Sequence, residues 1–423
     1  MNRLTPLERS ALVSIGALTA LAGAANYGHW APVPRFAVAT LALAGLAWIV
    51  SFATEQLGER FGPAITGMMQ STLGNLPELF VVIFALQKGE LVVAQTAIVG
   101  SIFANAMLVL GLVIVVGARR APDGVMRFSH RLPRDTATLL LVTVFIIVLL
   151  GLSLGSHDPA SHHVEAISAV GAVSLLVVYL AWVVPYLRAD TAPGAEDLPS
   201  GQADAQGLAS GGAAGVALPS GQADAQGLAS GRAAGGALMS GQPEAQRLAS
   251  GEPPAEHLAP GQPAAVHVGG PRLSLRLTLT LLLVAGVASA FVSDWFVNAL
   301  LPAIVQLHIS QAFAGLVIVA IAGNAVENTA GLVLAWKGHS DLAISVVKNS
   351  VAQIAAFLFP LLVLISFLLA TTLTFALAPV YIGALLVMAL AMWQVTADGE
   401  AAAFEGWALV ALYVILATLT LYE

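Results

Sequence analysis

The sequence predicts an all-α polytopic membrane protein with about eleven transmembrane helices. The 423-residue chain is 58% hydrophobic and only 10% charged, with a mean hydropathy of +0.85, whereas soluble domains carry about 25% charged residues. Apolar stretches recur along the chain at about 18 residues or more, the length needed to cross about 30 Å of hydrocarbon. A short motif also occurs twice, and it divides most of these stretches into two halves.

Hydropathy gives the order of the elements. The candidate spans are residues 10–27, 36–54, 63–87, 91–117, 136–154, 165–187, 274–293, 310–336, 341–368, 371–393 and 403–421. The polar N-terminus has no convincing small-residue cleavage site, which favours a retained first helix over a signal peptide. The predicted domains are an N-terminal transmembrane helix (1–30), a first five-helix repeat (31–189), a linker (190–271) and a second five-helix repeat (272–423).

The linker is predicted to be disordered and cytoplasmic. The segment LPSGQADAQGLASG begins at Leu198 and again at Leu218, and a degraded copy begins at Leu238, so the period is 20 residues. Ala, Gly, Ser, Pro and Gln dominate the segment, which cannot bury enough apolar surface to order itself. A solenoid is the alternative, but no position of the repeat offers a bulky core layer.

Basic residues predict the orientation. With a cytoplasmic N-terminus and eleven spans, the inner side holds all 17 Lys and Arg residues except Arg35, Lys88 and Lys348. The cluster from Arg119 to Arg134 lies in a short loop, where the positive-inside rule is strongest. We therefore expect a bacterial-type inner (plasma) membrane protein with its N-terminus in the cytoplasm and its C-terminus outside.

A second repeat relates the two halves of the chain. At a shift of 249 residues, GNLPE at 74–78 falls on GNAVE at 323–327, Lys88 falls on Lys337, and Ser101 falls on Ser350. Each half has five spans, an odd number, so the halves must enter the membrane from opposite sides. Inverted repeats of this kind place the substrate site near the midplane, between the halves.

Each copy of the motif carries an acidic residue inside an apolar run, Glu78 in the first and Glu327 in the second. A charged carboxylate at mid-bilayer depth costs on the order of 2.5–3.5 kcal/mol, and this chain carries that cost twice. The two carboxylates are expected to bind a cation, a proton, or each in turn. Asn75 and Asn324 lie about one helical turn before the acids, on the same face. The alternative is a pair of buried, protonated acids bonded to nearby backbone.

The span after each motif adds polar groups, namely Ser101 and Asn105 in the first half and Ser350 and Gln353 in the second. Such groups either complete a cation site or join helices by hydrogen bonds. Hard oxygen ligands suit Ca²⁺ and also alkali cations. No His or Cys accompanies them, which argues against zinc or copper. The candidate metal-binding residues are Glu78, Glu327, Asn75, Asn324, Ser101, Asn105, Ser350 and Gln353.

These motifs resemble a known family. GNLPEL followed by GSIFAN, and GNAVEN followed by NSVAQIAAF, look like the paired signature regions of the Ca²⁺/H⁺ antiporters in the cation/Ca²⁺ exchanger superfamily. The resemblance covers spans 2–11. It implies ten core helices in two inverted halves joined by a hydrophilic cytoplasmic loop. It also implies that Glu78 and Glu327 bind the exchanged ions and that Asn75 and Asn324 contribute nearby oxygens.

Two positions depart from the family pattern. Asn328 stands where many members have His, and Asn349 stands where they commonly have Gly. Next to Asn349 is Lys348, an ammonium group inside a span. It either snorkels or forms a salt bridge, for example to a glutamate, or it is a tethered cation that competes with the transported ion. A shifted span boundary is the third alternative.

The predicted function is secondary antiport of Ca²⁺ against H⁺, without enzymatic activity and without a cofactor. The alternatives are Na⁺ or K⁺ exchange against protons on the same scaffold, a cation channel, or a non-transporting scaffold. No Walker motif is present, so nothing indicates ATP hydrolysis. The expected partners are small inorganic cations and the lipid bilayer, not nucleic acid, and the sequence leaves the oligomeric state open.

Overall fold

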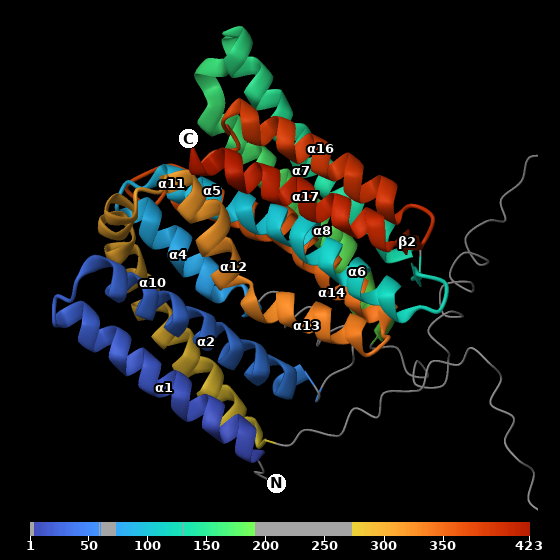
Figure 1. Ribbon diagram of the computed structural model, residues 1–423. Helices are drawn as coiled ribbons and strands as arrows, with labels where there is room; N and C mark the ends of the chain where they lie inside the picture. Colours follow the sequence, from blue (N-terminus) through green and yellow to red (C-terminus); the bar gives the residue numbers. More distant parts are fainter. Residues whose placement is uncertain (1–3, 59, 61–72, 130, 191–272) are drawn as a thin grey trace, which may run out of the picture. The chain divides into compact units, whose positions relative to one another are not determined.

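The computed structural model describes residues 4–58, 60, 73–129, 131–190 and 273–423. These residues are mainly helical, and the predicted class of all-α polytopic membrane protein is confirmed (Figure 1). The predicted linker, apart from its first residue, lies outside the described residues, so its disorder stays a prediction. The first part of the third predicted span, residues 63–72, lies outside them too.

Before the first half of the repeat, α1 (Pro6–Tyr27) begins with a capping box. The Glu8 amide donates to Thr5 Oγ1 at 3.2 Å, and the Thr5 amide donates to Glu8 Oε2 at 2.7 Å. These bonds satisfy amide groups that a helix start leaves without partners. The following elements are α2 (Pro32–Gly58), α4 (Leu76–Gln87), α5 (Leu91–Phe103), the π-helical η1 (Ala104–Val109), α6 (Leu110–Arg120), α7 (Arg131–Ser156), the 3₁₀ turn η2 (Pro159–His163) and α8 (Val164–Asp190).

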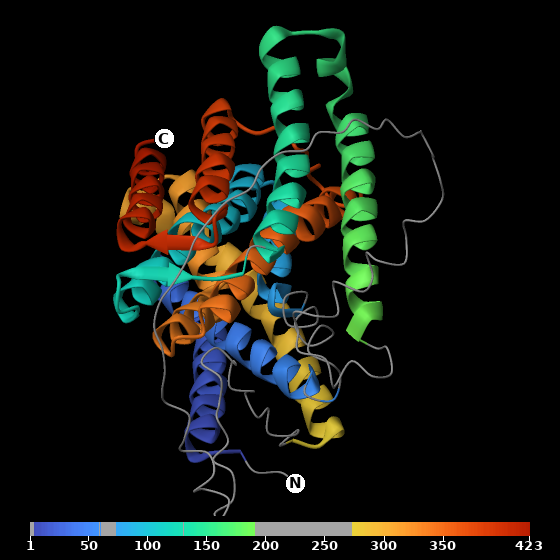
Figure 2. The same ribbon diagram turned by 90° about the vertical axis from the view of Figure 1, so that its right-hand side faces the viewer.

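The second half begins with a long helix, α10 (Leu275–Leu307). The elements after it are α11 (Gln311–Phe313), the π-helical η4 (Ala314–Val319), α12 (Ala320–Gly323), α13 (Ala325–Trp336), α14 (Ser340–Gln353), the π-helical η5 (Ile354–Leu358), α15 (Phe359–Ser366), α16 (Pro379–Thr396) and α17 (Ala403–Leu421). Figures 1 and 2 show α1, α2 and α10 side by side, and α2 and α10 meet at Phe36 and Phe296, whose ring centroids are 5.1 Å apart.

Within the described ranges, nine helices are long and apolar enough to cross a membrane. The helices at Gln311–Gly323 and Asn328–Trp336 meet at a bend of 58° and make a tenth span if the bent pair is counted as one. Helix α4 is the described part of the third predicted span. Because only part of the third span is described, the predicted total of eleven transmembrane spans stays a prediction.

Local features recur at the shift of 249 residues found in the sequence. Gly89 (φ +81°) follows α4, and Gly338 (φ +84°) follows α13. Both glycines end their helices with a left-handed residue, a conformation that is costly for other residue types. The π-helical segments η1 and η5 also fall at matching positions. The two halves thus share local structure, while the domain boundaries stay a prediction.

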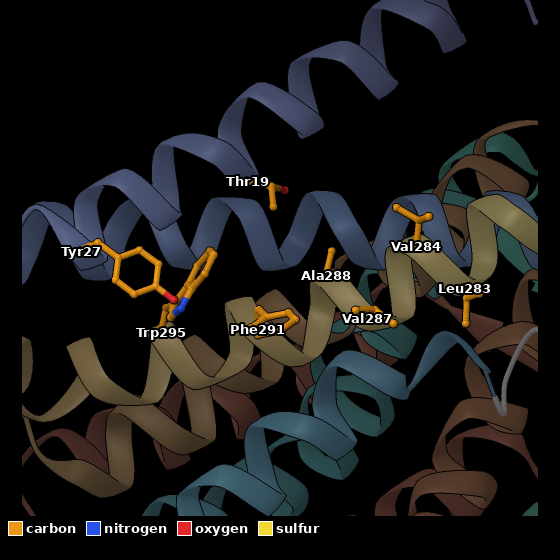
Figure 3. Close-up of a pocket in the computed structure, with 8 residues that line it drawn as sticks. All are labelled: Thr19, Tyr27, Leu283, Val284, Val287, Ala288, Phe291 and Trp295. Atoms are coloured by element: carbon orange, nitrogen blue, oxygen red, sulfur yellow. The ribbon is translucent and has the colours of Figure 1, made fainter.

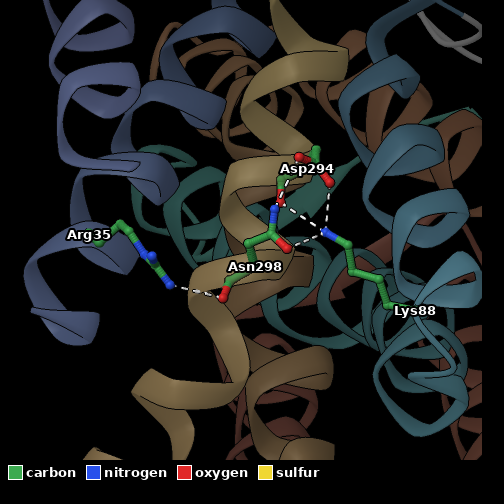
Figure 4. Close-up of polar contacts among 4 residues, drawn as sticks. All are labelled: Arg35, Lys88, Asp294 and Asn298. Atoms are coloured by element: carbon green, nitrogen blue, oxygen red, sulfur yellow. Dashed lines mark hydrogen bonds and ion pairs between the residues drawn. The ribbon is translucent and has the colours of Figure 1, made fainter. Parts of the chain in front are cut away.

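Helix α10 is longer than predicted. From hydropathy, the seventh span was predicted to end at residue 293, before Asp294, but the helix continues to Leu307. Asp294 is accommodated because Lys88, which follows α4, donates to its Oδ1 atom at 2.6 Å and to Asn298 Oδ1 at 2.7 Å (Figure 4). Arg35, near the start of α2, donates to the Asn298 carbonyl at 3.1 Å. A window average of hydropathy does not register partners that come from other helices.

The tenth span was predicted wrongly at its start. Residues 371–378 are apolar but not helical, and α16 begins only at Pro379. Leu373 and Phe375 are fully buried in protein. Their backbone amides donate to hydroxyl groups, Leu373 to Ser366 Oγ at 2.8 Å and Phe375 to Ser168 Oγ at 3.2 Å. Irregular backbone is tolerated at membrane depth where protein supplies such partners.

A two-stranded sheet was not predicted. Strand β1 (Val125–Arg127) pairs antiparallel with β2 (Glu400–Ala402), with Val125 opposite Ala402. Arg127 donates to Glu400 Oε1 at 3.2 Å and pairs with Asp123 at 2.6 Å. Because α6 packs against α17, the loops at their ends lie together. Strands of three residues are too short for alternation to reveal them.

Two glycines let α5 and η4 cross closely. An ideal Cβ at Gly100 would lie 2.5 Å from Leu316 Cα, and one at Gly315 would overlap the Thr96 hydroxyl. Either side chain would have to push the two backbones apart. This crossing brings Ser101 of the first half close to the break between α12 and α13 in the second half.

Candidate cation-binding site

Asn324 marks the break between α12 and α13. Its backbone leaves the helical region (φ −102°, ψ 15°), and Asn75 before α4 does the same (φ −83°, ψ 5°). The Asn324 side chain does not cap α13. Its Nδ2 atom instead donates to Ser101 Oγ at 2.9 Å and to the Ala320 carbonyl at 3.0 Å. Broken helices at membrane depth occur where they line a cavity or are buried in protein.

Glu78 lies in the first turn of α4 and is fully buried. The start of a helix is a favourable place for a carboxylate because the backbone amides there carry partial positive charge. An ideal Cβ at Gly323 would lie 3.6 Å from the Cβ of Glu78. The two Gly-Asn motifs, which are 249 residues apart in the sequence, therefore meet in the folded chain.

Glu327 occupies the same place in α13 that Glu78 occupies in α4, the first helical turn after the asparagine. Only its backbone belongs to the described part of the chain. Its part in the site therefore stays a prediction.

The remaining predicted residues are all buried, and two pairs of them join the halves. Asn324 bonds to Ser101 as described, and Asn105 Nδ2 donates to Ser350 Oγ at 3.2 Å. The Oδ1 atom of Asn324 and the Oε1 atom of Gln353 are buried without a hydrogen-bond partner among the described residues. Amide oxygens of this kind are hard ligands that could complete the shell of a bound cation.

Asn75 is also buried. Within the described side chains, which exclude that of Glu327, no three His, Cys, Asp or Glu residues lie close enough together to hold a metal ion. A cation bound at the motifs would therefore depend largely on amide, hydroxyl and carbonyl oxygens beside the carboxylates.

Ser293 on α10 is a site neighbour that the sequence did not reveal. Its hydroxyl is buried and donates to the Pro77 carbonyl at 3.4 Å, next to Glu78. Ser289, one turn earlier on the same helix, is fully buried, and its hydroxyl has no partner among the described residues. The pair at a spacing of four residues in an apolar helix was the available signal, and it lies outside the repeated motif.

Lys348 is buried, and its ammonium group donates to Thr396 Oγ1 at 2.7 Å, at the end of α16. Ser350, two residues later, contacts Asn105 of the first half. Residues two apart on a helix point in directions about 200° apart. The contact therefore supports packing of Lys348 between helices, with a hydroxyl as partner, over a tethered cation at the motifs.

The fold and this buried polar cluster define a polytopic membrane protein with a polar region where its two halves meet. The chain belongs to the sodium/calcium exchanger protein family, whose model matches residues 33–185 and 277–422. The resemblance inferred from the motifs is confirmed.

Relatives match over nearly the whole chain. A Ca²⁺/H⁺ antiporter of Synechocystis is 27% identical over 404 residues, covering 94% of this chain and 93% of its own. A Ca²⁺/H⁺ antiporter of Aphanothece halophytica is 25% identical over 389 residues, covering 92% and 90%. A vacuolar calcium ion transporter of Schizosaccharomyces pombe is 25% identical, covering 93% and 80%. These relatives are named as transporters, not as enzymes.

Solved structures share the fold. Native YfkE matches with a TM-score of 0.68 at 21% identity, covering 98% of this chain and 100% of its own. The H⁺/Ca²⁺ exchanger CAX matches with a TM-score of 0.64 at 14% identity, covering 97% and 88%.

Proposed function

We propose that the chain is a secondary antiporter that exchanges Ca²⁺ for H⁺ through Glu78 and Glu327. The observation that carries the proposal is the burial of Glu78 beside Gly323, so that the two repeated motifs adjoin. The names of the relatives support the choice of ions. The site would lie near the bilayer midplane, where inverted repeats place their substrates.

Charge balance explains how such a site couples two ions. Two ionised carboxylates in a buried site cost several kcal/mol each unless they are compensated. One Ca²⁺ neutralises both carboxylates, and so do two protons. The loaded forms can therefore change their exposure from one side of the membrane to the other more easily than the empty, doubly charged form. Exchange follows without ATP.

The surrounding groups have separate tasks in this mechanism. Ser101 accepts from Asn324 and holds the bend of the second half against α5. Asn324 Oδ1 and Gln353 Oε1 are available to face the ion. Asn75, Asn105 and Ser350 supply further oxygens or hold those that do. No cofactor is needed, and the partners are the transported cations and the lipid around the helices.

The orientation belongs to the proposal as well. The positive-inside rule places the N-terminus and the linker in the cytoplasm and the C-terminus outside. A bacterial-type inner membrane is the expected location. In that setting, the proton gradient would drive Ca²⁺ out of the cell.

Exchange of Na⁺ or K⁺ for protons is the second candidate, because oxygen ligands also suit alkali cations. Proton flux in everted vesicles, with Ca²⁺, Na⁺, K⁺ and Mg²⁺ added in turn, separates the candidates. We expect Ca²⁺ to release protons from acid-loaded vesicles at concentrations where the other cations do not. A response to Na⁺ or K⁺ alone would favour the second candidate, and ion current without proton movement would favour a channel.

A further inference from the structure

A groove of about 580 Å³ lies between α1 and α10 (Figure 3). Its lining is almost entirely apolar and includes Val287, Ala288 and Phe291 of α10. Thr19 of α1 also lines it, but its hydroxyl donates to the carbonyl of Ile15 in its own helix at 2.8 Å. The lining therefore offers little to a polar ligand.

The groove arises because the two helices touch closely at one end only. An ideal Cβ at Gly23 would lie 3.0 Å from the Trp295 ring, and the ring centroids of Tyr27 and Trp295 are 5.8 Å apart. The large Trp295 side chain fills the space at this end. Further along α10, the small Ala288 leaves the space opposite Thr19 open (Figure 3).

The groove opens away from the protein. Leu283 is 67% exposed and Phe291 is 57% exposed, although both lie in a membrane-spanning helix. Lipid is therefore the solvent at the mouth of the groove. Arg35 bonds to the carbonyl of Asn298, about one turn beyond Trp295, which places the Tyr27 and Trp295 end toward a membrane surface. Tyr and Trp are enriched at that depth because their rings are amphipathic.

The dimensions of the groove identify its occupant. From Leu283 to Trp295 the groove runs about 18 Å along α10 at 1.5 Å per residue, comparable with the depth of one leaflet, about 15 Å. An alkyl chain matches the groove in length, and the apolar lining and the lipid-facing mouth match its chemistry.

We infer that the groove binds one acyl chain of a membrane phospholipid, which enters from the Trp295 end and lies between α1 and α10. The bound chain fills the space that Ala288 leaves and holds the N-terminal helix to α10. The binding site is independent of the exchanged ion, so the inference holds whichever cation the protein carries.

Photocrosslinking tests this inference. The full chain is reconstituted in vesicles of phosphatidylcholine that contains a fraction of molecules with a diazirine on one acyl chain. After illumination, adducts are mapped by mass spectrometry. We expect adducts to concentrate on residues 283–291 relative to Val414 and Ile415 of α17, which are 53% and 65% exposed but do not line the groove. A diazirine-labelled free fatty acid, used in parallel, shows whether a headgroup is required.

Three variants of α10 test the groove itself, with Gly286→Phe as the control. Ala288→Phe fills the groove and should abolish the enrichment, with Ala288→Leu as a smaller change if the first variant does not fold. Gly286→Phe on the same helix should retain the enrichment, since a Cβ there meets no described atom within 4 Å. Equal labelling of the two surfaces, enrichment that survives both Ala288 variants, or crosslinks between protomers at residues 283–291 would overturn the inference.

Discussion

Asn324 combines two tasks at the residue scale. Its backbone ends α12, and its side chain crosses to Ser101 in the other half. The sequence predicted that this residue belongs to the site, because the motif is repeated and carries an acid. The sequence could not predict the bond to Ser101, which depends on the close crossing of α5 and η4 at Gly100 and Gly315.

Asn324→Ala should weaken apparent Ca²⁺ affinity and lower the free energy of unfolding by about 1–3 kcal/mol, the cost of leaving buried polar groups without partners. Ca²⁺-dependent proton flux and thermal unfolding in detergent measure the two effects. Thr329→Ala on α13 is the control, because among the described residues its hydroxyl bonds within its own helix, to the Ala325 carbonyl at 2.7 Å. Parental affinity in Asn324→Ala would show that the side chain does not serve the site.

Lys348→Met should leave the Ca²⁺ dependence and the pH profile of exchange as in the parent. The ammonium group contacts Thr396 on α16. Without it, the Thr396 hydroxyl keeps its bond to the Met392 carbonyl at 2.7 Å, so no buried donor loses its partner. Flux measured between pH 6 and pH 9 provides the test. A positive charge close to two carboxylates lowers their pKa values and repels Ca²⁺. A shift of the profile toward higher pH in Lys348→Met would therefore restore the tethered-cation interpretation.

At the scale of elements, side chains of one helix often determine where another helix begins or ends. Asp294 ends an apolar window in the sequence, yet α10 continues past it because Lys88 supplies a countercharge. Residues 371–378 are apolar enough to suggest a helix, but they are not helical. Leu373 and Phe375 are buried there, and their amides donate to hydroxyl groups of α15 and α8. Hydropathy records only how apolar a segment is. It therefore predicted the positions of the spans well and some of their ends poorly.

The link between α4 and α10 should contribute modestly to stability. Lys88 and Asp294 are partly exposed (Figure 4), and pairs of this kind are typically worth about 0.2–1 kcal/mol. A double-mutant cycle with Lys88→Gln and Asp294→Asn, read by thermal unfolding at low and high salt, should give a coupling in that range that falls with salt. Purely additive effects of the two substitutions would show that the contact does not stabilise the pair of helices.

At the scale of the whole molecule, the repeat predicted local features that the two halves share. The glycine turns and π-helical segments recur at the same shift, while five spans in each half, and therefore opposite insertion, stay a prediction. The small sheet between β1 and β2 could not be predicted, because it forms only once α6 and α17 bring two loops together. The side-chain environment of Glu327 is still a prediction.

Deleting residues 195–268 and replacing them with a short flexible linker should leave exchange largely intact. The repeats offer no core, and the entropy of closing a loop changes only slowly with its length. Proton flux in vesicles, normalised to protein inserted, measures the effect. Loss of exchange in a well-inserted deletion would show that the segment regulates transport.

Glu78 and Glu327 are proposed to bind both Ca²⁺ and protons, and the most direct test of this proposal is Ca²⁺-dependent proton flux in everted vesicles that contain Glu78→Gln or Glu327→Gln. Glutamine keeps the size of the side chain but cannot alternate between cation-bound and protonated forms. We expect either substitution to abolish exchange while the amount of folded, inserted protein stays at the parental level. Exchange at the parental rate in either variant would contradict the proposal.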